Sequence, residues 1–199
     1  MGDPILLIIS IPIILMTIAI HEFSHAKVAD MLGDSTPRLS GRLSLNPLHH
    51  IDPIGLLMLV IVRFGWAKPV PINPYNFENP KSGMAMVGIA GPISNLLIAW
   101  IGAIFLRNLP LSAEGSAGIL AAGLAYVVWI NVALALFNLI PIPPLDGSRV
   151  LHALLPPEQA SVLDQIEPYG FFILIGLLFF PPTQELLSNA IQSVVNILL

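Results

Sequence analysis

Three long apolar runs, separated by polar and proline-rich stretches, set the pattern of this chain. They cover residues 5–20, 84–106 and 118–140. The last two contain the roughly 20 apolar residues that a membrane-spanning helix needs. The first is shorter, but its helical pattern continues to about Leu32, where Gly33 is a typical helix stop. The pattern therefore predicts three full membrane spans.

The segment between the first and second spans has no helical pattern of that length. Residues 42–45, Arg42-Leu43-Ser44-Leu45, alternate polar and apolar side chains, which suits a short strand. Residues 54–66 form a short apolar run interrupted by Arg63, so we expect a re-entrant segment rather than a span. Residues 68–74 are rich in proline and predict an extended connection.

The C-terminal part of the chain leaves the number of spans open. Residues 171–180 are apolar but few, and residues 186–199 form an amphipathic helical stripe. That stripe could pack on the core, lie on the bilayer or join two copies. We expect an all-α polytopic membrane protein with a short β or re-entrant segment between its first two full spans. A single membrane-embedded domain over residues 1–199 would have its core at 5–155 and hydrophobic and amphipathic helices at 168–199.

Composition excludes several classes of protein. Apolar residues make up 55% of the 199 positions, and only 8 basic and 12 acidic residues are present. Soluble domains carry about 25% charged residues. A net charge of −4 without a basic stripe excludes nucleic-acid binding. With no cysteine, the chain has neither a disulfide framework nor a thiolate-ligated metal.

The basic residues segregate by side of the membrane if residues 54–66 do not cross. Only Arg107 then lies on one side. The other side collects Lys27, Arg38, Arg42, Arg63, Lys68, Lys81 and Arg149. By the positive-inside rule, this second side is cytoplasmic.

Candidate chemistry begins at the end of the first helix. His21-Glu22-Phe23-Ser24-His25 is an HExxH motif, whose two histidines lie one helical turn apart and can hold one zinc ion. Glu22 is placed beside them to exchange a proton with water. Ionisable residues at membrane depth are retained mainly for function. The alternative is a polar helix end that protrudes into the headgroups.

A catalytic zinc site needs a third protein ligand. The candidates are His49, His50, His152, Asp52, Glu78 and Asp146. Asp146 is favoured by context, because it follows a proline-rich extended segment after a span and lies two crossings from His25. Taken alone, Asp146-Gly147 would more simply be an interfacial turn.

Together these motifs resemble the site-2 protease family of intramembrane zinc metalloproteases. The resemblance rests on HEFSH at 21–25, AGPISN at 90–95 and NLIPIPPLDG at 138–147, and covers roughly residues 5–155. GRLSLNPLHHIDPIG and GWAKPVPINP are similar to the compact prokaryotic branch, which lacks PDZ and CBS domains.

Membership of this family implies an enzyme with one Zn²⁺ per chain. His21, His25 and Asp146 would ligate the ion, Glu22 would be the catalytic acid/base, and Asn138 would lie in the active-site region. The implied partners are the lipid bilayer and a membrane-spanning or membrane-anchored protein substrate. The implied location is the cell membrane, with the active site toward the cytoplasm.

Three polar groups invite hypotheses about substrate. An exposed strand edge at Arg42, Leu43, Ser44 and Leu45 would pair with an unwound substrate by strand addition. Asn95 and Asn138 would hold the freed peptide groups, although a helix–helix hydrogen bond explains Asn95 equally well. For His49, His50 and Asp52, gating, loop anchoring or surface exposure is favoured over a second metal site.

Two other functions compete with proteolysis. A catalytically silent zinc-binding scaffold or chaperone could retain the metal core, although it would not need Glu22. Three clear spans without an inverted repeat argue against a transporter that uses the histidines as an ion path. The oligomeric state is left open.

Overall fold

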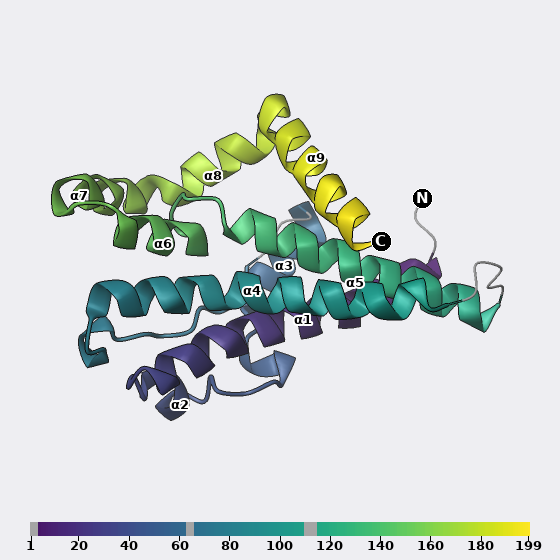
Figure 1. Ribbon diagram of the computed structural model, residues 1–199, viewed down its shortest axis with the longest axis horizontal. Coiled ribbons are helices and arrows are strands. Elements are labelled where there is room, and N and C mark those ends of the chain that lie inside the picture. The colour runs from purple at the N-terminus through teal and green to yellow at the C-terminus, as the bar shows by residue number, and fades with distance from the viewer. Residues whose placement is uncertain (1–3, 63–65, 110–114) are drawn as a thin grey trace.

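Three long helices form the body of the molecule. The computed structural model describes residues 4–62, 66–109 and 115–199. In it α1 (Pro4–Met31), α4 (Pro80–Arg107) and α5 (Ser116–Asn138) lie side by side (Figure 1). Within the described residues, four segments are long and apolar enough to cross a membrane: Ile8–Met31, Pro80–Arg107, Ala117–Asn138 and Pro157–Phe179. The chain is thus an all-α multi-pass membrane protein, and the three predicted spans are confirmed.

Local sequence explains where these helices begin and end. α1 stops just before Gly33, whose φ of 105° is in the left-handed region that glycine adopts at low cost. The side chain of Asn79 accepts a hydrogen bond from the backbone N–H of Ser82 and so caps α4. Pro80 opens α4 at the first helical position, where its missing N–H is not needed.

The connection between α1 and α4 is made of short elements. These are α2 (Thr36–Leu39), the 3₁₀ turns η1 (Pro47–His49) and η2 (Pro74–Asn76), and α3 (Pro53–Val62). With 10 residues, α3 is about 15 Å long, half the hydrocarbon thickness. It is not among the four candidate spans, which agrees with a re-entrant segment. Arg63 lies outside the described residues.

The expected strand at Arg42–Leu45 is not found in the described part of the chain. The guanidinium of Arg42 is buried and donates to the backbone carbonyl of His49, so the loop folds back on itself. A local alternation of polar and apolar residues could not reveal this contact. The isolated antiparallel bridge instead pairs Ile51 with Ala67.

The C-terminal third forms a bent arm. α6 (Asp146–Leu154) packs along α4, and α7 (Pro157–Ile166), η3 (Glu167–Tyr169) and α8 (Gly170–Phe179) continue the chain beyond it. The chain turns at Pro181, and α9 (Pro181–Leu198) runs back to α5 (Figure 1).

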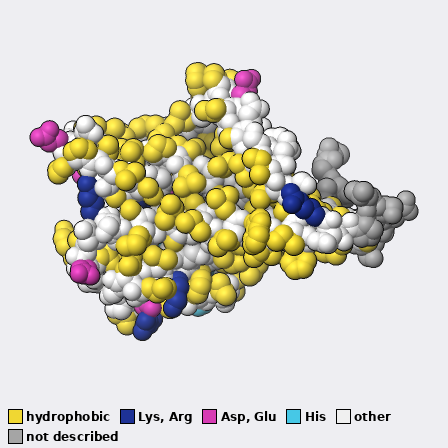
Figure 2. Space-filling model, in the orientation of Figure 1, with side chains coloured by type: hydrophobic (Ala, Val, Ile, Leu, Met, Phe, Trp, Pro, Cys, Tyr) yellow, Lys and Arg dark blue, Asp and Glu magenta, His cyan; other side chains and the backbone are white. Residues whose placement is uncertain are grey.

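Small residues allow the long helices to pack closely. Ala99 and Ala103 of α4 share a buried cluster with Val128 and Val132 of α5. A Cβ on Gly102 would lie 3.3 Å from Val128, a contact that leaves little room. Small residues at helix contacts are typical of membrane proteins. The face of the molecule shown in Figure 2 is largely hydrophobic, as expected for contact with lipid.

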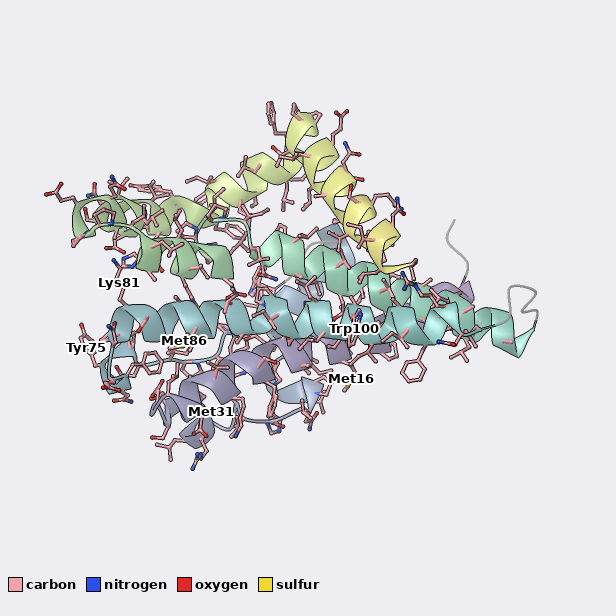
Figure 3. All side chains as sticks on the ribbon, in the orientation of Figure 1. Met16, Met31, Tyr75, Lys81, Met86 and Trp100 are labelled. Atoms are coloured by element: carbon pink, nitrogen blue, oxygen red, sulfur yellow. The ribbon has the colours of Figure 1, made fainter. Side chains whose placement is uncertain are left out.

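A basic residue lies at each end of α4. Lys81 begins α4 and donates a hydrogen bond to the carbonyl of Leu155, which joins α4 to α6. In Figure 3, Lys81 and Tyr75 lie at one end, whereas Trp100 lies toward the other. Arg107 ends α4 at that opposite end.

Candidate metal centre

Three buried side chains converge between α1 and α6. His21 and His25 are one turn apart on α1, and their Nε2 atoms are 3.0 Å apart. The Oδ2 atom of Asp146 lies 3.1 Å from Nε2 of His21 and 3.2 Å from Nε2 of His25. The structure therefore brings together the three residues that the sequence motifs singled out, and they could hold a metal ion.

The spacing of these atoms fits zinc. Metal–ligand distances of about 2.0–2.1 Å in a regular tetrahedron separate neighbouring ligand atoms by about 3.3–3.4 Å. The three observed separations, 3.0–3.2 Å, are slightly shorter than this edge. A small outward movement of each side chain would accommodate the ion, with the fourth vertex left for water or substrate.

Hydrogen bonds behind the imidazoles orient them toward the centre. Nδ1 of His25 lies 2.7 Å from the backbone carbonyl oxygen of Val87. A carbonyl can only accept, so Nδ1 carries the hydrogen and neutral His25 keeps its Nε2 lone pair free for a metal. Nδ1 of His21 lies 3.3 Å from Oδ1 of Asn95 and can donate in the same way. Both acceptors come from α4.

Two glycines make the close approach possible. A Cβ on Gly91 would lie 2.4 Å from Nε2 of His25 and 2.5 Å from Cε1 of His21. A Cβ on Gly147 would lie 2.2 Å from the carbonyl oxygen of Leu139. Real Cβ atoms essentially never approach so closely, so a side chain at either position would displace part of the centre.

Asp146 is presented by a break between two helices. α5 ends at Asn138, and α6 begins at Asp146 itself. The prolines in between cannot continue a helix, which lets the chain turn the carboxylate back toward α1. Oδ2 faces the histidines, and Oδ1 lies 3.8 Å from Nη1 of Arg149. The second oxygen thereby faces a cation one turn along α6, at a distance too long for a hydrogen bond.

The centre opens into a cavity of about 610 Å³. Glu22 and Asn138 lie on its wall with the three convergent residues. Most of the remaining lining is apolar and comes from Trp66–Val70, α5 and α8. The rings of Trp66 and Phe171 meet edge to face at 6.1 Å between centroids, so the loop and α8 touch beside the cavity.

The other sequence candidates occupy different places. Asn95 is fully buried behind His21 and does not line the cavity, so its position favours the helix–helix hydrogen bond. Asn138 lines the cavity and donates to the carbonyl of Leu134. Residues 42–45 do not line it.

The polar cluster after this loop anchors backbone. His50 is buried, with Nε2 2.7 Å from the carbonyl of Ser44. Nδ1 of His49 lies 3.1 Å from the carbonyl of Gly41, and Asp52 accepts from two N–H groups at the start of α3. These contacts match the loop-anchoring interpretation.

Sequence reasoning missed several contributors. Gly91 lies in a run of small residues, which could have suggested a close helix approach. Arg149 follows Asp146 at i+3, a spacing that signals a pair on one helix. The carbonyl of Val87 leaves no trace in sequence, because every residue has one.

Fold and site together define a class: a multi-pass helical membrane protein with an HExxH metal centre. Comparison with known proteins makes the class specific. Peptidase family M50 matches residues 9–180. The chain belongs to this family, the site-2 proteases, and is a zinc metalloprotease.

Two similar proteins carry names that agree with this family assignment. YwhC of Bacillus subtilis (strain 168) is 39% identical over 172 residues, covering 84% of this chain and 78% of the relative. Rip2 of Mycolicibacterium smegmatis (strain ATCC 700084 / mc(2)155) is 32% identical over 174 residues, covering 84% of this chain and 65% of the relative. The names of both assign them to the zinc metalloproteases. No solved structure matches the chain significantly.

Proposed function

We propose that this protein hydrolyses a peptide bond in or near a transmembrane segment of a membrane protein, from the cytoplasmic half of the bilayer. The observation that carries the proposal is the position of His21, His25 and Asp146. They lie buried between membrane helices, on the wall of a cavity that could admit an unwound peptide.

His21, His25 and Asp146 would hold one zinc ion per chain. Bound there, zinc supplies a Lewis acid that polarises a carbonyl and increases the acidity of water. The Nδ1 partners, Val87 and Asn95, keep both imidazoles in the tautomer that can ligate.

Glu22 is the proton carrier in this proposal. Its carboxylate takes a proton from the attacking water and returns it to the amide nitrogen as the carbon–nitrogen bond breaks. Water provides the oxygen of the new carboxylate, so no acyl-enzyme forms. General acid–base catalysis of this kind contributes typically about 10²–10⁴-fold.

The substrate backbone would lie along the extended segment Trp66–Val70. Four of its five residues line the cavity, and Pro69 prevents the segment from forming a helix beside the metal centre. Asn138 is on the same wall, and its amide oxygen would accept a hydrogen bond from a freed peptide N–H. Residues 42–45 lie outside this wall, which argues against the strand edge first expected there.

Cleavage of a co-expressed model membrane substrate tests the proposal. We expect wild type to cleave it and Glu22→Gln to lose at least about 100-fold in rate, with zinc content unchanged. Equal cleavage by both proteins would contradict the role of Glu22. Absence of cleavage by zinc-loaded wild type across several transmembrane substrates would favour the scaffold function.

A further inference from the structure

The C-terminal helix α9 packs against two of the candidate membrane spans, which places it beside them at the same depth. Ile191 and Val195 on its inner face pack into the cluster formed by Ala99, Ala103, Val128 and Val132 of α4 and α5. Its first turns adjoin Phe137 of α5. At its other end, the guanidinium of Arg107 donates to the carbonyls of Ile197 and Leu199. α9 therefore runs beside two membrane spans from the end of α5 to the end of α4.

The outer face of α9 is polar at this depth. Asn189, Gln192 and Asn196 are all exposed, and their spacing of three and four residues aligns them along one line of the helix. We call these three residues the amide stripe. Gln192 donates to Asn196 at 2.8 Å, within the stripe. Figure 2 shows a pale band over α9 that interrupts the hydrophobic surface.

A polar stripe facing hydrocarbon is costly. A side-chain amide loses several kcal/mol when it leaves water without a compensating hydrogen bond. The exposed faces of α4 and α5 avoid this cost, because they present the apolar side chains of Ile93, Leu97 and Trp129 to the lipid. The amide stripe therefore calls for a polar partner.

We propose that the partner is a second copy of this chain, joined α9 to α9 about a two-fold axis along the membrane normal. Such an axis places each residue near its own counterpart. An amide both donates and accepts, so the three residues complement themselves, whereas a stripe of one charge would repel itself. Amides that hydrogen-bond between helices are common in membrane interfaces.

One acidic residue continues the line of the stripe. Glu185 precedes Asn189 by one turn, and it precedes Gln192, the middle residue of the stripe where the two helices would cross, by two turns or roughly 10 Å along the axis. Crossing helices diverge over this distance, so the two carboxylates are kept apart. The proposal does not depend on protease activity, and its test measures only the association of two copies of the chain.

The absence of cysteine makes cross-linking in membranes a direct test. Single substitutions Asn189→Cys, Gln192→Cys and Asn196→Cys should give disulfide-linked dimers on oxidation. The matched controls are Leu186→Cys and Ile197→Cys, on the same helix, where the side chains are 71% and 77% exposed. These lie to one side of the stripe and should give little dimer.

Two results would overturn the proposal. One is equal cross-linking at stripe and control positions, or none at the stripe. The other is rapid labelling of the stripe cysteines by a water-soluble maleimide, which would place the stripe in water or headgroups.

A second measurement, which needs no cysteine variant, tests the proposal even if those variants do not fold. Single-molecule photobleaching in liposomes of defined lipid should show paired wild-type chains. In Asn189→Leu/Gln192→Leu/Asn196→Leu, the dimer dissociation constant should rise at least about tenfold. Zinc content serves as the folding control. Monomeric wild type, or an unchanged dimer in the triple variant, would contradict the interface.

Discussion

At the scale of single residues, the metal centre depends on contacts behind its ligands. His25 is oriented by a backbone carbonyl, His21 by Asn95, and Asp146 by Arg149. Each contact is made by the ring nitrogen or carboxylate oxygen that points away from the centre, while the other one faces it. Such outer contacts typically contribute a factor of about 10–100 in metal affinity.

Asn95 allows this dependence to be measured. We expect Asn95→Ala to weaken zinc binding by about 10–100-fold, because His21 loses the acceptor that fixes its tautomer. Competition with a chelator measures the affinity. Asn131→Ala is the matched control, since Asn131 is also buried and bonds to α1, but its partner is Thr17 and not a residue of the centre. Equal affinity in both variants would show that Asn95 does not orient His21.

At the scale of elements, sequence pattern predicted the long helices well and the loops poorly. Apolar runs and the stop at Gly33 define α1 because these signals are local. The strand expected at 42–45 failed because Arg42 turns inward to His49, a contact that periodicity does not encode. The proline-rich break before Asp146 made it a candidate, but only the resemblance to the site-2 proteases singled it out from an interfacial turn, whereas the Gly91 contact depends on how α1 and α4 pack.

Asp34 connects the loop that follows α1 to the turn that precedes α4. It is fully buried and accepts hydrogen bonds from Thr36, from the backbone of Asn73 and from the side chain of Asn76. Burial alone would raise the pKa of Asp34, but these hydrogen bonds outweigh it and hold that pKa below its ordinary value. The end of α1 is thereby joined to the turn before α4.

The lowered pKa gives a stability prediction with a definite sign. The stabilisation by Asp34 is present above the unfolded-state pKa of about 3.9 and is lost as pH falls below it through the folded-state pKa. Asp34→Asn should lower the free energy of unfolding at pH 7 by on the order of 2 kcal/mol and weaken the acid dependence. Thermal unfolding across pH measures both effects.

The matched control for Asp34 is a surface acid. Asp164 is 62% exposed and pairs with His152, so Asp164→Asn should change stability little. An Asp34→Asn variant that is as stable as Asp164→Asn, with an unchanged acid profile, would contradict the proposed tie.

At the scale of the whole molecule, charge and depth define an orientation. Lys81 begins α4 at the end where α1 finishes, and Arg107 ends α4 on the far side. We propose that the end with Lys81 faces the cytoplasm, because the sequence collects seven of the eight basic residues on that side if residues 54–66 do not cross. The metal centre lies in the half of α1 nearer this end, since His21 and His25 belong to its last three turns.

Labelling in intact cells tests this orientation. Ser40 and Asn108 are exposed at opposite ends of the body, and single cysteines there have no native competitor. A membrane-impermeant maleimide should label Asn108→Cys and leave Ser40→Cys unlabelled until the membrane is permeabilised. The reverse pattern would place the metal centre toward the outside.

The most direct test of the central claim is zinc stoichiometry in the purified protein, measured by mass spectrometry for wild type, Asp146→Ala and Glu22→Gln. We predict one zinc per chain in wild type and Glu22→Gln, and loss of tightly bound zinc in Asp146→Ala. A full zinc complement in Asp146→Ala would contradict the centre formed by His21, His25 and Asp146.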